Sequence, residues 1–164
     1  MEVMQEMENA IRDSQWKEII RALEQSKRLI EATLRSEEQT VARMVGTAHI
    51  QNTSLIKYSD ENSMACVLAI AYYYAHADYI FHREYQTGLG FADLVLMPRK
   101  NVNKPAIIVE LKYGHSTEEA IAQIKNRHYT DKVAEYTGDI LLVGINYDRD
   151  TKEHTCQIER WNKE

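Results

Sequence analysis

Two short apolar runs with charged residues inside them constrain this chain more than any other feature. The first run, residues 91–97, contains Asp93, and the second, residues 105–112, ends with Glu110 and Lys112. Side chains of a strand alternate between its two faces, so Glu110 and Lys112 share one face. If the two strands pair, Asp93 can lie on that face as well. The pattern predicts two carboxylates and an ammonium group in one place on a sheet.

This constellation has two interpretations. Carboxylates are preferred ligands of hard divalent cations, and a lysine beside them suits metal-assisted hydrolysis. Strand ends also carry surface ion pairs that contribute little energy, and Asp93 could cap a turn after Gly90. Burying an unpaired charge is costly, which favours a cation when three charges interrupt apolar strands. Spacing alone leaves a metal-dependent site and ordinary strand-end charges about equally supported.

The rest of the chain predicts helices followed by a mixed sheet. Apolar residues recur at helical spacing from residue 1 to about 57, and Ser36 with Gln39 forms a capping box that would begin a second helix. A helix between the third and fourth strands would make those strands parallel, and the polar last strand suits a sheet edge. We expect strands at 78–86, 91–97, 105–112, 139–146 and 154–161, and helices after residue 59 and over 117–127.

Bulk composition sets bounds on the kind of protein. A chain of 164 residues suffices for one domain with a real core. The net charge of −5 counts mildly against a polyanion-binding protein, although an uneven charge distribution can still hold one. The acidic start lacks a signal-peptide pattern, no apolar run is long enough to span a bilayer, and two distant cysteines suit free thiols. These features predict a cytoplasmic protein without membrane contact.

The helical N-terminal region contains no motif for catalysis. Its methionine and leucine residues at helical spacing indicate a packing surface. An exposed helical hairpin that docks a partner is the alternative.

The charged motif resembles the signature of a known superfamily. Gly-x-x-Asp in one strand, here ending at Asp93, and Glu-x-Lys in the next, here Glu110 to Lys112, are typical of the PD-(D/E)XK, or restriction-endonuclease-like, nucleases. The resemblance runs from about Trp16 to Arg160 and is to the C-terminal nuclease-like module of bacterial proteins that usually carry an AAA-type ATPase-like domain. The segments that carry it are 60–63, 83–85, 90–93, 98–100, 104–106, 109–112, 120–124 and 142–147.

The resemblance implies an α/β fold with a restriction-endonuclease-like mixed sheet of about four to five strands flanked by helices. Residues 1–57 would form a helical N-terminal extension packed on the core. Residues 58–164 would form the nuclease-like domain. The chain has no Walker A motif, so the ATPase domain would be a partner absent from this chain, which is then either a stand-alone member or a fragment.

The resemblance also implies a metal centre. Asp93, Glu110 and the main-chain carbonyl of Leu111 would hold Mg²⁺ (or Mn²⁺), and Glu61 on the helix before the sheet could complete the ligand set. Lys112 would orient or activate the attacking water and stabilise charge in the transition state.

Further positions would support the site. Gln123 and Tyr129 resemble a Gln…Tyr motif that positions the site and the DNA in some superfamily members, although five residues separate them here, wider than the commoner spacing. His82 and Glu84 are candidates for a supporting position beside the metal ligands.

Three functions follow from these observations. The first is metal-dependent phosphodiester hydrolysis of DNA by a nuclease, with nucleic acid as partner. The second is a catalytically silent nuclease-like module that binds or assembles, and the third is a metal-dependent hydrolase of small phosphoesters. Homodimer formation is open in each case.

Overall fold

The computed structural model describes residues 5, 14–52, 61–85, 92–126, 136 and 138–161. Within these ranges only the backbone is described at 14–16, 52, 61–65, 83–85, 92 and 93.

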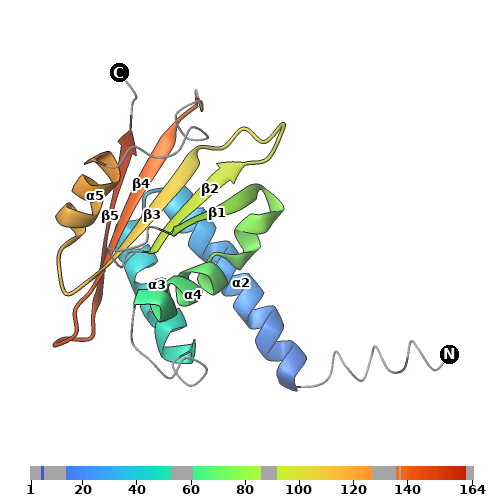
Figure 1. Ribbon diagram of the computed structural model, residues 1–164. Coiled ribbons are helices and arrows are strands. Elements are labelled where there is room, and N and C mark those ends of the chain that lie inside the picture. The colour runs from blue at the N-terminus through green and yellow to red at the C-terminus, as the bar shows by residue number, and fades with distance from the viewer. Residues whose placement is uncertain are drawn as a thin grey trace.

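A five-stranded mixed sheet forms the centre of the molecule (Figure 1). Its strand order follows the chain, with antiparallel pairs throughout except for the parallel third and fourth strands. The parallel pair confirms the crossover expected from the helix between those two strands. The strands are β1 (Tyr79–Tyr85), β2 (Ala92–Pro98), β3 (Ala106–Tyr113), β4 (Ile140–Tyr147) and β5 (His154–Trp161).

Helices cover both faces of the sheet (Figure 1). Three helices and a short 3₁₀ turn pack on one face, and a single described helix packs on the other, against β3, β4 and β5. Such a three-layer arrangement buries both faces of the central strands, which explains why β3 and β4 are apolar on both sides. The helices are α2 (Ser14–Leu34), α3 (Glu38–Asn52), α4 (Glu61–Ala71), the 3₁₀ turn η1 (Tyr73–Ala77) and α5 (Thr117–Asn126).

Two apolar clusters hold the layers together. Alternate residues of β3 divide between them: Ile107 and Val109 face α2, α3 and α4, whereas Ala106 and Ile108 face α5. The period-two alternation of a strand produces this division directly. The restriction-endonuclease-like fold expected for the chain is therefore present.

The N-terminal helices depart from expectation in two details. The apolar stripe of α2 is buried at Leu29 and Ile30, but Ile19 and Leu23 in its first half are exposed. Ser36 does not begin α3. It has a positive φ of 56°, its N–H donates to the carbonyl of Thr33, and the following N–H donates to Ala32, which is the geometry that closes a helix. A serine in the left-handed region cannot adopt the extended backbone of an N-cap, so the predicted capping box was wrong.

Ser116 and Glu119 also have the spacing of a capping box, and they lie at the start of α5. The Ser116 hydroxyl accepts the Glu119 N–H at 3.1 Å, which confirms Ser116 as the N-cap. The Glu119 carboxylate pairs instead with His115 Nδ1 at 2.9 Å. None of the helices that the structure describes has both the length and the apolar character required to cross a membrane.

Candidate active site

Acidic residues occupy one row across three adjacent strands. The register places Asp93 of β2 directly opposite Glu110 of β3, and Glu84 of β1 directly opposite Asp93. Directly opposed residues of antiparallel strands share a face, with Cβ atoms about 4.5–5.5 Å apart. Three acidic positions therefore lie side by side on one face. The row continues through Gly144 of β4, which is the parallel-strand partner of Glu110.

The row lies on the face that α5 covers in part. Ile108 and Leu142 pack against α5. Glu110 and Gly144 lie two residues further along the same strands, so they are on the same face of the sheet. Leu111 points into the opposite cluster, toward α2, α3 and α4. Only the main chain of Leu111 can therefore contribute to a site on the α5 face.

Glu110 and Lys112 are both buried. The Glu110 side chain is 0% exposed and both carboxylate oxygens are shielded from solvent, while Lys112 is 5% exposed. Burial of a carboxylate is costly unless cations or hydrogen-bond donors compensate for the lost water. Oxygen ligands in this setting are the donors that Mg²⁺ and Mn²⁺ prefer. The residues present therefore fit a divalent metal.

Lys112 is joined to α5 through Gln123. The Lys112 Nζ donates a hydrogen bond to the Gln123 Oε1. Gln123 is carried on the inner side of α5, whose residues Ile121 and Ile124 are buried in the cluster below. The resemblance implied that Gln123 helps to position the site and the DNA. Its described contact is with the lysine, and its contact with a substrate stays a prediction.

A close approach between α5 and β4 sets the position of that helix. A Cβ atom at Gly144 would lie 2.9 Å from the main-chain oxygen of Thr117 and 3.1 Å from side-chain atoms of Ala120 and Ile121. Such distances require atoms to move, so the helix can rest at this depth only over a glycine. Sequence reasoning missed Gly144, although a glycine inside an apolar strand is itself a signal of close backbone approach.

Asn146 is a second residue that sequence reasoning missed. It is buried and lies opposite Lys112 in the β3–β4 register. Its Oδ1 accepts the His115 N–H at 3.0 Å, which fixes the connection between β3 and α5. A polar residue near the end of an apolar strand, as at Lys112, is the pattern that could have identified it.

The structure describes the remaining predicted residues only in part. Glu61 begins α4, and α4 packs against β2 and β3 on the face opposite Glu110. The Glu61 carboxylate and the whole of Tyr129 lie outside the described residues. His82 is partly buried and lies opposite Val95, two residues along β1 from Glu84 and on the same face. The roles of these residues stay predictions.

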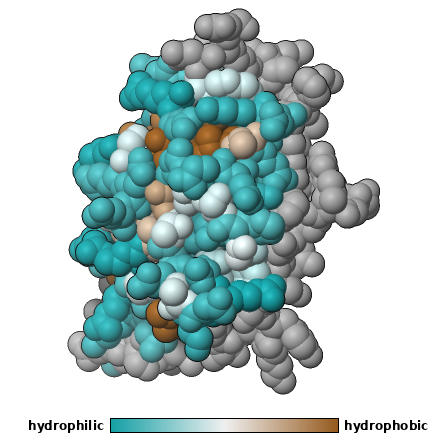
Figure 2. All heavy atoms as spheres, turned by 90° about the vertical axis from the view of Figure 1, so that its left-hand side faces the viewer, coloured by the Kyte–Doolittle hydropathy of each residue, from teal (hydrophilic) through white to brown (hydrophobic). Residues whose placement is uncertain are grey.

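The α5 face of the sheet has an exposed apolar residue on the outer strand β1. Ile80, on the same face of β1 as Glu84, is 45% exposed. By contrast, Figure 2 shows that the outer surface over α5 and β5 is mainly hydrophilic, with small apolar areas. Helix α5 packs on β3, β4 and β5, and Ile80 of β1 is exposed on the same face.

The fold and site together define a restriction-endonuclease-like α/β protein with an acidic row and a buried lysine. A family model described as the PD-(D/E)XK nuclease superfamily matches residues 59–161, and the chain belongs to that superfamily. No curated protein and no solved structure matches the chain. Membership indicates nuclease-type phosphodiester hydrolysis, a nucleic-acid substrate and the use of divalent metals such as Mg²⁺, which superfamily nucleases generally require.

Proposed function

We propose that this chain hydrolyses phosphodiester bonds of DNA with Mg²⁺ or Mn²⁺. The observation that carries the proposal is the direct opposition of Asp93 and Glu110 across β2 and β3, with buried Lys112 two residues further along β3. Like charges directly opposed across strands destabilise a sheet, and a bound cation would compensate for them. The family match supports the same class of reaction.

Each residue has a distinct proposed task. Asp93, Glu110 and the Leu111 carbonyl would hold the metal, and Glu61, at the start of the helix on the opposite face, is the candidate for a further ligand. When bound, the metal would polarise the phosphodiester and lower the pKa of a water molecule. Lys112 would orient that water and stabilise the negative charge that develops on the phosphoryl oxygens. Gln123 would hold the Lys112 ammonium in place, and Tyr129 would contact the DNA.

Glu84 belongs to the same proposed site. Its position directly opposite Asp93 puts a third acid next to the proposed ligands. A carboxylate there adds negative charge and so increases cation affinity, whether it contacts the metal directly or through water. The sequence predicted a supporting position for Glu84 beside the metal ligands, and the proposal makes Glu84 part of the metal site.

The first test is a calorimetric titration of the full chain with Mn²⁺. Wild type should bind the metal, and Asp93→Ala should abolish or strongly weaken binding. Absence of binding by the wild-type chain would contradict the enzyme hypothesis and favour the silent binding module.

The second test separates catalysis from metal binding. Lys112→Ala should keep Mn²⁺ binding and lose cleavage of labelled single- and double-stranded DNA. Loss of metal binding in this variant would show that the assigned tasks are wrong. Hydrolysis of a small phosphodiester or phosphomonoester at a rate unaffected by DNA would instead favour the small-phosphoester hydrolase.

A further inference from the structure

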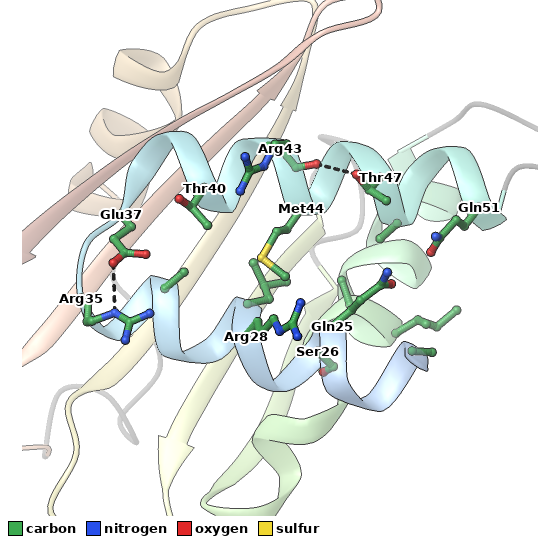
Figure 3. A pocket seen from close by; sticks show the side chains of 16 residues that line it. Gln25, Ser26, Arg28, Arg35, Glu37, Thr40, Arg43, Met44, Thr47 and Gln51 are labelled. Atoms are coloured by element: carbon green, nitrogen blue, oxygen red, sulfur yellow. Dashed lines mark hydrogen bonds and ion pairs between the residues drawn. The ribbon is translucent and has the colours of Figure 1, made fainter. Parts of the chain in front are cut away.

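A groove of about 360 Å³ runs between α2 and α3, on the face of the sheet away from Glu110 (Figure 3). Leu29 and Ala32 of α2 and Met44 of α3 provide apolar lining. Figure 3 shows the Met44 side chain projecting from α3 toward α2. Polar residues line the edges of the groove on both helices. The groove thus has the form of sites that accept the apolar face of a helix.

The edges of the groove are predominantly basic. Arg28, Arg35 and Arg43 line it, with Glu37 as the acidic residue in the same lining. Arg35 pairs with Glu37 at 3.0 Å. Within the described part of the chain, Arg28 and Arg43 form no ion pair, and both are exposed. An occupant of this groove should therefore be acidic as well as amphipathic.

The chain itself contains such a sequence at its start. Residues 1–13 read Met-Glu-Val-Met-Gln-Glu-Met-Glu-Asn-Ala-Ile-Arg-Asp. Val3, Met7 and Ile11 recur at four-residue spacing, which places them on one side of a helix. Four side chains of the segment are acidic and Arg12 alone is basic. The apolar stripe matches the lining of the groove, and the acidic residues match Arg28 and Arg43.

Geometry favours the segment of another molecule over the segment of the same one. Residues 1–24 contain no glycine or proline, so the sequence offers no strong turn signal for reversing direction before α2. A 13-residue helix is about 20 Å long, which equals the length of α2 from Ala22, where it begins to line the groove, to its end at Leu34. To lie in its own groove, the segment would have to fold back onto the helix that it leads into.

We propose that the groove between α2 and α3 binds residues 1–13 of a second copy of this chain as an acidic amphipathic helix. Reciprocal binding of the two segments produces a two-fold symmetric dimer, in which each copy supplies one segment and one groove. The interface lies on the helical layer that covers the face of the sheet opposite the acidic row. Nucleic acid is a poorer occupant because the groove has an apolar lining and no aromatic residue on which a base could stack.

Two measurements on the full chain test the proposal. Sedimentation velocity should show a monomer–dimer equilibrium that depends on protein concentration. An excess of a synthetic peptide of residues 1–13 should shift the equilibrium to monomer. Fluorescence anisotropy should show that the labelled peptide binds the chain, more weakly as salt concentration rises. A scrambled peptide of equal charge that lacks the apolar stripe should not bind.

Charge reversal in the groove identifies the site. Arg28→Glu and Arg43→Glu should each weaken peptide binding by about tenfold, because each replaces an attraction with a repulsion. The exposed Lys100 lies in the connection between β2 and β3, so Lys100→Glu is a control with the same change in charge. A peptide with Glu2→Lys and Glu6→Lys should regain affinity for Arg28→Glu and Arg43→Glu. Met44→Glu should reduce binding through the apolar lining.

Several results would overturn the proposal. These are a monomer at all concentrations together with no binding of the peptide, or equal binding of the peptide to wild type and to the arginine variants. Displacement of the peptide by a DNA oligonucleotide from wild type but not from Arg28→Glu would assign the groove to nucleic acid. Displacement by an acidic helix of another protein, without any dimer, would assign it to a foreign partner.

Discussion

The Lys112 ammonium on β3 donates a hydrogen bond to the Gln123 side-chain oxygen on α5, so the proposed catalytic lysine is held by the helix above it. Lys112 is buried, and a buried ammonium requires hydrogen-bond acceptors to compensate for lost water. Gln123 therefore acts as a positioning residue for Lys112.

Gln123→Leu tests this relationship. The variant removes the acceptor while keeping a similar volume, so the lysine should lose its orientation, and kcat for DNA cleavage should fall by about tenfold to a hundredfold. Mn²⁺ affinity, measured by calorimetry, should stay unchanged. Gln123→Glu keeps an acceptor oxygen for the Lys112 ammonium, so cleavage should fall less than in Gln123→Leu. An equal loss of cleavage in the two variants would count against a positioning role of Gln123.

Glu110→Gln tests the repulsion between the paired acids. The change removes one negative charge from a buried position opposite Asp93. Without metal the melting temperature should rise, whereas Mn²⁺ affinity should fall. Differential scanning calorimetry with and without Mn²⁺ measures both effects. Glu118→Gln, at an exposed position in the first turn of α5, is the control. An equal or lower melting temperature of the metal-free Glu110→Gln variant would count against repulsion.

Glu84→Gln tests the third position of the acidic row. The neutral amide keeps the size of the side chain and removes its charge next to Asp93. Mn²⁺ affinity should fall by less than in Asp93→Ala, and the affinity loss should diminish as the salt concentration rises. Calorimetric titration at two ionic strengths makes the comparison. An affinity equal to that of wild type would remove Glu84 from the site.

Gly144→Ala tests the depth at which α5 rests on β4. The added methyl group meets the Thr117 main-chain oxygen, so overpacking should destabilise the fold by about 1–3 kcal/mol. Displacement of α5 should also weaken the contact between Gln123 and Lys112, and cleavage should fall while Mn²⁺ binding is retained. Chemical denaturation and cleavage assays measure the two effects.

Gly114→Ala provides the matched control for that variant. Gly114 has a positive φ of 71° and no atom within 4 Å of a Cβ, so alanine should cost about 1–2 kcal/mol through backbone strain without pushing on α5. If Gly114→Ala loses about as much stability as Gly144→Ala but keeps cleavage, the loss of cleavage in Gly144→Ala comes from the displaced helix. Equal loss of cleavage in both variants would contradict a specific effect of the position of α5.

The lowered pKa of His154 predicts that the folded state loses stability in acid. Its pKa is lowered from 6.5 to about 4 because burial disfavours the charged imidazole, and nearby His49 adds to the effect. The unfolded chain therefore takes up the proton at higher pH than the folded chain. The stability contributed by neutral His154 is fully present above pH 6.5 and declines as the pH falls toward 4.

Thermal melting from pH 7 to pH 4 checks this sign. His154→Gln, which cannot titrate, should show a flatter dependence of melting temperature on pH than wild type. His115→Gln, at an exposed histidine, should keep most of the wild-type dependence. A slope in His154→Gln as steep as that of wild type would assign the acid sensitivity to other groups.

The amino-acid sequence determined the order of the elements and the chemistry available to the site. Two-sided apolar runs identify β3 and β4 as central strands because a sheet covered on both faces excludes polar side chains. Charges at Asp93, Glu110 and Lys112 stand out against those runs. Local signals were less reliable at helix ends. Ser36 has the residue type of an N-cap, but the backbone that closes α2 places it in the left-handed region.

Tertiary structure alone decided which residues meet. The register between strands places Asp93 directly opposite both Glu110 and Glu84. Alternation within a strand fixes the face on which a residue lies, but not which residue of the next strand it meets. The contact between Gln123 and Lys112 depends on how deeply α5 rests over Gly144, which is a property of packing between two elements. The groove beside Arg28 and Arg43 likewise exists only because α2 and α3 fold against each other. Local sequence specifies elements and their faces, whereas distances between elements follow from close packing of the whole core.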